Sequence, residues 1–155
     1  METLHPRVRL VWAVGAVVAA AVVGVAAAVV GRLDLPVPPW LPATLAVLAV
    51  VVAVGGVALA VLRYRVWRFE VRDDSLYLVR GVLTRTDTSV PFVRVQHVDT
   101  RRGPVERAVG LASVVVYTAG TRGADITVPG LTPERAADLR ERLRDLATES
   151  EFDAV

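Results

Sequence analysis

The fold of this chain is decided first by the stretch Leu10–Val30, LVWAVGAVVAAAVVGVAAAVV, which holds no charged side chain in 21 residues. An α-helix of that length measures roughly 31 Å at about 1.5 Å per residue, and the hydrocarbon core of a bilayer is roughly 30 Å thick. A second uncharged run, Trp40–Leu62, has 23 residues. Because a helix satisfies its own backbone hydrogen bonds in lipid, the two runs predict two transmembrane helices.

The segment between the two runs, Gly31–Pro39, contains three prolines and cannot continue a helix. It predicts a short turn, so that the two helices form a hairpin. A cleaved signal peptide is the alternative, with Arg7 and Arg9 as its basic start and Ala26–Ala28 as its cleavage site. The apolar run is too long for that interpretation, since the apolar part of a signal peptide is typically about 7–15 residues.

Small residues recur along one face of each run. They are Ala16, Ala20, Gly24 and Ala28 in the first run, and Ala49, Ala53, Gly56 and Ala60 in the second. Small side chains let helices approach closely in a membrane, so these stripes predict the faces along which the helices pair. The alternative is that they only reflect the high alanine and glycine content of the runs.

The arginines around the helices predict the topology. Arg7 and Arg9 precede the first helix, whereas the connecting loop holds only Arg32, which Asp34 offsets. Four arginines follow the second helix: Arg63, Arg65, Arg68 and Arg72. By the positive-inside rule we expect a multi-pass protein of the plasma membrane with both termini in the cytoplasm.

Composition excludes several kinds of site. The chain has no cysteine, which rules out disulfides, thiolate metal sites and a cysteine nucleophile, and its net charge of +2 does not favour nucleic acid. Its two histidines, His5 and His97, are far apart in sequence, so we expect no metal and no cofactor. His97 and Asp99 could hydrogen-bond on one strand face, but nothing places a serine beside them. The sequence therefore predicts a protein that is not an enzyme.

After the second helix the apolar period changes to two, which predicts β-strands. The predicted strands are 65–71, 76–79, 82–90, 93–98, 111–118 and 124–128, with turns at 73–75 and 119–123 and a helical turn at 105–109. The apolar phase slips at Gln96–His97, which predicts a bulge.

The C-terminal part predicts one amphipathic helix. Thr132 is a good N-cap, and Pro133 suits the first helical position. An apolar stripe follows at Ala136, Leu139, Leu143 and Leu146. We expect this helix to cover an open side of the sheet. The predicted organisation is a cytoplasmic tail at 1–9, the helix pair at 10–62 (10–30 and 40–62), a soluble α+β domain at 63–147 and a flexible acidic tail at 148–155.

Four segments of the soluble part carry a resemblance. They are VPFVRVQHV at 90–98, GPVER at 103–107, GLASV at 110–114 and TAG at 118–120. Together they resemble the bacterial pleckstrin-homology-like domain family that is found in small two-helix membrane proteins. The resemblance covers about residues 64–146 and implies a β-barrel of antiparallel strands capped by a C-terminal helix. It implies no biochemical activity, because fold does not determine function.

One departure from the wider pleckstrin-homology pattern bears on the ligand. Domains of that fold that bind inositol phosphates present basic residues at the first strand–turn–strand. Here the turn is Asp73-Asp74-Ser75, which would repel a phosphate despite the flanking Arg72 and Arg80. We therefore do not expect phosphoinositide recognition.

The resemblance and the arginines nominate two sets of candidate residues. Arg94, Gln96 and Arg107 belong to the family-like segments, and they either tie the bulge and the helical turn or form a partner-binding surface. Arg63, Arg65, Arg68 and Trp67 are predicted to anchor the domain at the headgroups of an anionic inner leaflet.

Three functions are compatible with this sequence. The first is a membrane-anchored binding or scaffold module that docks a protein partner or self-associates. The second is a purely structural homo-oligomer. The third, an accessory subunit of a transport or enzyme complex, is the weakest, since neither helix carries an ionisable residue at membrane depth.

Overall fold

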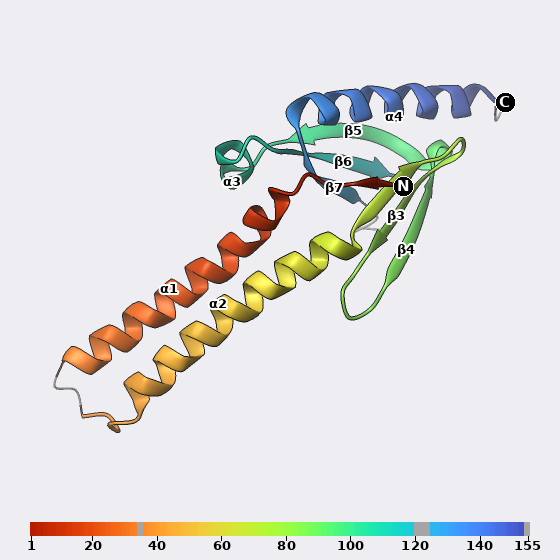
Figure 1. The fold of residues 1–155 in the computed structure, drawn as a ribbon. Coiled ribbons are helices and arrows are strands. Elements are labelled where there is room, and N and C mark those ends of the chain that lie inside the picture. The colour runs from red at the N-terminus through yellow and green to blue at the C-terminus, as the bar shows by residue number, and fades with distance from the viewer. Residues whose placement is uncertain (34–35, 120–124, 154–155) are drawn as a thin grey trace. The chain divides into compact units, whose positions relative to one another are not determined.

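The structure, a computed structural model, describes residues 1–33, 36–119 and 125–153 (Figure 1). The chain divides into two compact units. One unit is Arg9–Leu62, and the other combines Met1–Val8 with Arg63–Val155. Several predicted features lie wholly or mainly outside the described residues. They are the turn at 119–123, the start of the last predicted strand, Asp34 and the last two residues.

The first unit consists mainly of two long helices, whose ends at Val8 and Arg63–Val66 belong to the other unit. α1 spans Val8–Arg32 and α2 spans Leu41–Val66, and both are long and apolar enough to cross a membrane. The small residues meet as predicted, because a Cβ atom added to Gly56 would lie 2.0 Å from the Cβ atom of Ala16. Gly24 likewise faces Ala49. Glycine and alanine therefore permit the close approach of the two helices.

The second unit consists of two antiparallel sheets and a C-terminal helix. The first sheet has the order β1 (Glu2–Thr3), β2 (Arg68–Val71), β3 (Ser75–Arg80) and β4 (Thr86–Pro91). After the 3₁₀ turn η1 (Phe92–Arg94), the second sheet has the order β5 (Val95–Arg101), β6 (Ala112–Thr118) and β7 (Ile126–Leu131). The short helix α3 (Pro104–Ala108) joins β5 to β6, and α4 (Pro133–Asp153) follows β7. The described strands thus form two sheets and no closed barrel.

The N-terminal residues belong to the first sheet, which sequence reasoning missed. Glu2 pairs with Phe69 and Thr3 pairs with Arg68. The Leu4 and Val8 side chains that follow are 2% and 1% exposed. A strand of two residues is too short for any period to reveal it, so the sequence alone predicts only a tail at residues 1–9.

The junction between α2 and the first sheet differs from the prediction. The helix continues to Val66, so Arg65 is helical and the strand begins only at Arg68. The Arg68 guanidinium explains where the helix ends, since its Nη1 donates to the carbonyl oxygens of Tyr64 at 3.3 Å and Trp67 at 2.8 Å. A basic side chain that satisfies the last carbonyls of a helix stabilises its C-terminus.

The predicted strand at 82–90 is shorter in the structure and begins at Thr86. Gly81 adopts a positive φ of 100°, and a Cβ atom there would lie 1.9 Å from the carbonyl oxygen of Thr84. Only glycine allows this close approach, so residues 81–85 form the tight turn of the β3–β4 hairpin.

α4 confirms the predicted amphipathic helix. Ala136 and Leu143 are fully buried and Leu139 is 9% exposed, whereas Leu146 is half-buried. The Thr132 Oγ1 atom accepts a hydrogen bond from the Arg135 N–H at 3.3 Å, as an N-cap should. The helix runs on to Asp153 and thereby includes most of the predicted flexible tail.

Candidate functional site

The predicted bulge lies at the start of β5. Val95 pairs with Thr118 and His97 with Tyr117, so Gln96 is the extra residue on β5. The backbone pairing continues past the bulge, where the Ala119 N–H donates to the Arg94 carbonyl at 2.8 Å. The Gln96 side chain is exposed.

An open groove of about 720 Å³ lies between this end of β5 and α4, which runs along β5 in Figure 1. β5 contributes Gln96, Val98 and Asp99 to the groove, and α4 contributes Arg140 and Arg144. In the described part of the chain, β5 has a strand neighbour on one side only, because β6 lies between β5 and β7. An edge strand has backbone N–H and C=O groups without ladder partners, and a further strand can pair with them.

A polar surface extends along β5 and β6 from this end of the sheet. The His97 Nε2 atom lies 2.8 Å from the Asp99 Oδ1 atom, as the alternation on β5 predicted. The His97 side chain is exposed and that of Asp99 is half-buried. The His97 ring lies 5.9 Å from the Tyr117 ring, measured between centroids. Arg101 donates a hydrogen bond to the Tyr117 hydroxyl. These contacts preorganise a face that combines an aromatic ring with both signs of charge.

The structure separates the residues of the predicted interaction surface. Arg94 and Gln96 lie at the start of β5, and both are exposed. Arg107 is exposed on α3, beyond the other end of the strand, which at about 3.3 Å per residue is roughly 20 Å away. The hydrogen bond that stabilises the helical turn is made by the residue next to Arg107. The Glu106 Oε2 atom accepts it from the Gly103 N–H at 2.7 Å.

Sequence reasoning missed Arg140 and Arg144. A signal was present, because each directly follows a leucine of the buried stripe, Leu139 or Leu143. Residues four apart lie on the same side of a helix, so the two guanidinium groups share the flank next to the buried face. Which strand that flank meets depends on how α4 packs, and the period does not contain that information.

The family is settled by comparison with known proteins. The family model described as "Bacterial PH domain" matches residues 9–147, which is most of the chain. The chain belongs to the bacterial PH domain family. It is also similar to the UPF0699 transmembrane protein YdbS of Bacillus subtilis (strain 168), with 38% identity over 91 residues. That match covers 59% of this chain and 55% of the relative, so the chain spans about half the length of the curated relative it matches. No solved structure matches.

The proposed headgroup anchors of this bacterial PH domain protein differ in their exposure. Arg63 and Arg65 are exposed in the last turn of α2, and their headgroup contact stays a prediction. Trp67 is different, since it is only 3% exposed and packs edge-on against Phe69 with 6.4 Å between ring centroids. Its ring has almost no surface left for lipid, so the prediction for Trp67 is wrong. Arg68 is half-buried on the carbonyls of the helix end.

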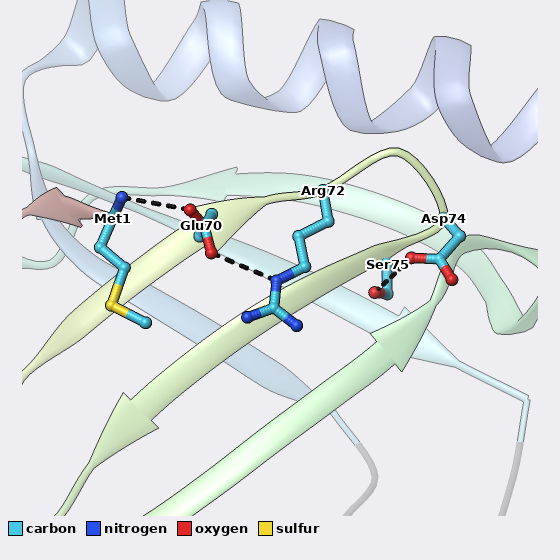
Figure 2. A network of polar contacts seen from close by, with 5 residues as sticks. All are labelled: Met1, Glu70, Arg72, Asp74 and Ser75. Carbon is cyan, nitrogen blue, oxygen red and sulfur yellow. Dashed lines mark hydrogen bonds and ion pairs between the residues drawn. The ribbon is translucent and has the colours of Figure 1, made fainter.

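Two separate sets of polar contacts lie in and next to the acidic turn of this bacterial PH domain protein (Figure 2). Glu70 binds Arg72 Nε at 3.2 Å and the N-terminal ammonium of Met1 at 3.3 Å. The hydrogen bond from Arg72, followed by the interaction with the ammonium group, holds the pKa of Glu70 below its usual value. The Arg72 guanidinium also lies 4.0 Å from the centroid of the Tyr77 ring. In the turn itself, the Ser75 hydroxyl donates to Asp74 at 2.8 Å.

The described residues contain no group of three His, Cys, Asp or Glu side chains that could hold a metal ion.

Proposed function

We propose that this bacterial PH domain protein is a membrane-anchored binding module whose soluble unit docks a protein partner at the inner face of the plasma membrane. The proposal assigns no catalytic role to the chain. The observation that carries it is the open groove between the edge strand β5 and α4.

The groove offers the two kinds of contact that an extended protein segment uses. The outer edge of β5 can hydrogen-bond to the backbone of an added strand, and groove side chains can then select its sequence. Arg140 and Arg144 favour a segment that carries carboxylates, while the exposed Val93 adds apolar surface. A small ligand would need a more enclosed site.

Phosphoinositide is the less favoured ligand for a physical reason. Asp73 and Asp74 place two carboxylates in the turn between β2 and β3. Arg72, which directly precedes the turn, is already bound to Glu70 and stacked on Tyr77. A phosphate there would meet net repulsion.

The cytoplasmic placement rests on the arginine distribution. Arg7 and Arg9 precede α1 and Arg63 and Arg65 end α2, whereas the loop between the helices holds only Arg32. The positive-inside rule then puts the soluble unit in the cytoplasm.

Site-specific photo-crosslinking in native membranes tests the docking proposal. A photoreactive amino acid at Gln96 is expected to give an adduct with a second protein, and the same residue at Thr127, exposed on β7, serves as the matched control. Changing both Arg140 and Arg144 to Glu should reduce the Gln96 adduct. An adduct of twice the mass of the chain would identify self-association instead, and equal labelling at Gln96 and Thr127 would contradict docking in the groove.

A further inference from the structure

The tip of the β3–β4 hairpin exposes the most accessible large apolar side chain among the described residues. Leu83 is 98% exposed, and Val82 lies beside it. Arg80 and Arg85 flank the tip and are both exposed, with Arg85 3.5 Å from Asp87. A single exposed leucine is ordinary on a protein surface. Its position in the sheet is what makes this one informative.

Strand register places the tip at the end of the sheet where the chain arrives from α2. β2 starts at Arg68, two residues after α2 ends at Val66. Arg68 pairs with Val79 in the antiparallel β3, so Arg80 and the turn after it reach beyond the start of β2. The acidic Asp73–Asp74 turn joins β2 and β3 at the other end of the same strands. Figure 1 shows that the two ends of β3 lie well apart.

Charge and polarity therefore differ between the two ends of one sheet. The end joined to the membrane-spanning helix carries Leu83, two arginines and Asp87, which pairs with Arg85. The far end carries two aspartates and Arg72. The tight turn at Gly81 preforms the tip, so no ordering of a loose loop is needed before contact.

We propose that Val82 and Leu83 insert into the interface of the bilayer that holds α1 and α2, with Arg80 and Arg85 at anionic headgroups. An apolar tip with a collar of arginines matches the boundary between acyl chains and headgroups, because arginine keeps its charge in the polar layer while its stem lies along apolar surface. This second attachment does not depend on the proposed protein docking in the groove.

Fluorescence on the full chain in vesicles tests the insertion. The chain has no native cysteine, so Thr84→Cys introduces a single labelling site next to an intact Leu83. Asp73→Cys at the opposite turn is the matched control. With a nitrobenzoxadiazole label and spin-labelled lipid in phosphatidylcholine–phosphatidylglycerol vesicles, we expect several-fold stronger quenching at position 84 than at position 73. Equal, water-like emission at both positions would overturn the proposal.

Variants in the same assay identify the groups responsible. Leu83→Asp should abolish the quenching at position 84, and changing Arg80 and Arg85 to Gln should weaken it in vesicles that contain phosphatidylglycerol. Leu83 is almost fully exposed, so an unchanged melting temperature will show that the Leu83→Asp fold is intact. Quenching that survives Leu83→Asp would overturn the proposal. A blue shift that grows with protein density and occurs without lipid quenching would also overturn it, and would instead indicate contact between copies of the chain.

Discussion

Gly130 shows how a single residue supports the attachment of the N-terminal segment. It adopts a positive φ of 65° in β7, and its carbonyl accepts a hydrogen bond from the His5 N–H at 2.7 Å. A Cβ atom at this position would lie 2.6 Å from the Cβ atom of Val8, which is 1% exposed. Glycine is therefore required twice, for its backbone conformation and for its lack of a side chain.

Gly130→Ala is expected to destabilise the soluble unit by about 2 kcal/mol or more, because a left-handed conformation costs about 1–2 kcal/mol and overpacking about 1–3. The melting temperature of the detergent-solubilised chain, followed by tryptophan fluorescence, should fall by at least about 8 °C. Gly110→Ala is the control, since Gly110 has a φ of 70° but an added Cβ atom would meet nothing closer than 3.8 Å. Equal losses for the two variants would contradict the steric part of this argument.

At the scale of elements, α4 is the part that local pattern predicted best. The N-cap Thr132 and the stripe through Leu139 and Leu143 were both confirmed, because capping and one-sided burial depend on neighbours along the helix. The strand boundaries were predicted less well. The alternation of Arg65 with Trp67 predicts a strand, but the helix continues through Arg65 until Arg68 satisfies the terminal carbonyls.

Leu143→Ala is expected to cost about 2–5 kcal/mol, since it removes a fully buried side chain and leaves a cavity beneath α4. The melting temperature should fall by at least about 8 °C in the same assay. Leu146→Ala, at a half-buried position of the same stripe, should cause a clearly smaller loss. A Leu143→Ala variant with the same melting temperature as the unchanged protein would show that α4 does not stabilise the sheet.

For the whole molecule, the main testable consequence of the arginine distribution is the membrane topology of the chain. A reporter enzyme that is active only outside the cytoplasm should give no signal when fused after Val155. The same reporter placed after Val37, in the loop between the helices, should give a strong signal, because that loop carries little positive charge. A strong signal from the fusion after Val155 would show that the topology is the opposite of the predicted one, with the groove at the outer face of the membrane.

Local sequence patterns are sufficient to predict the two membrane helices, the α4 helix, most strands and the bulge at Gln96. Each depends on composition or period within a window of neighbouring residues, where length, burial and backbone preference act locally. The tertiary structure alone decided that Glu2–Thr3 joins the first sheet, that Trp67 is buried and that Arg140 and Arg144 face β5 while Arg107 lies far away. It also arranged the strands of the described residues as two sheets and not as a closed barrel. These outcomes depend on pairing and packing between segments distant in sequence, which no local period encodes.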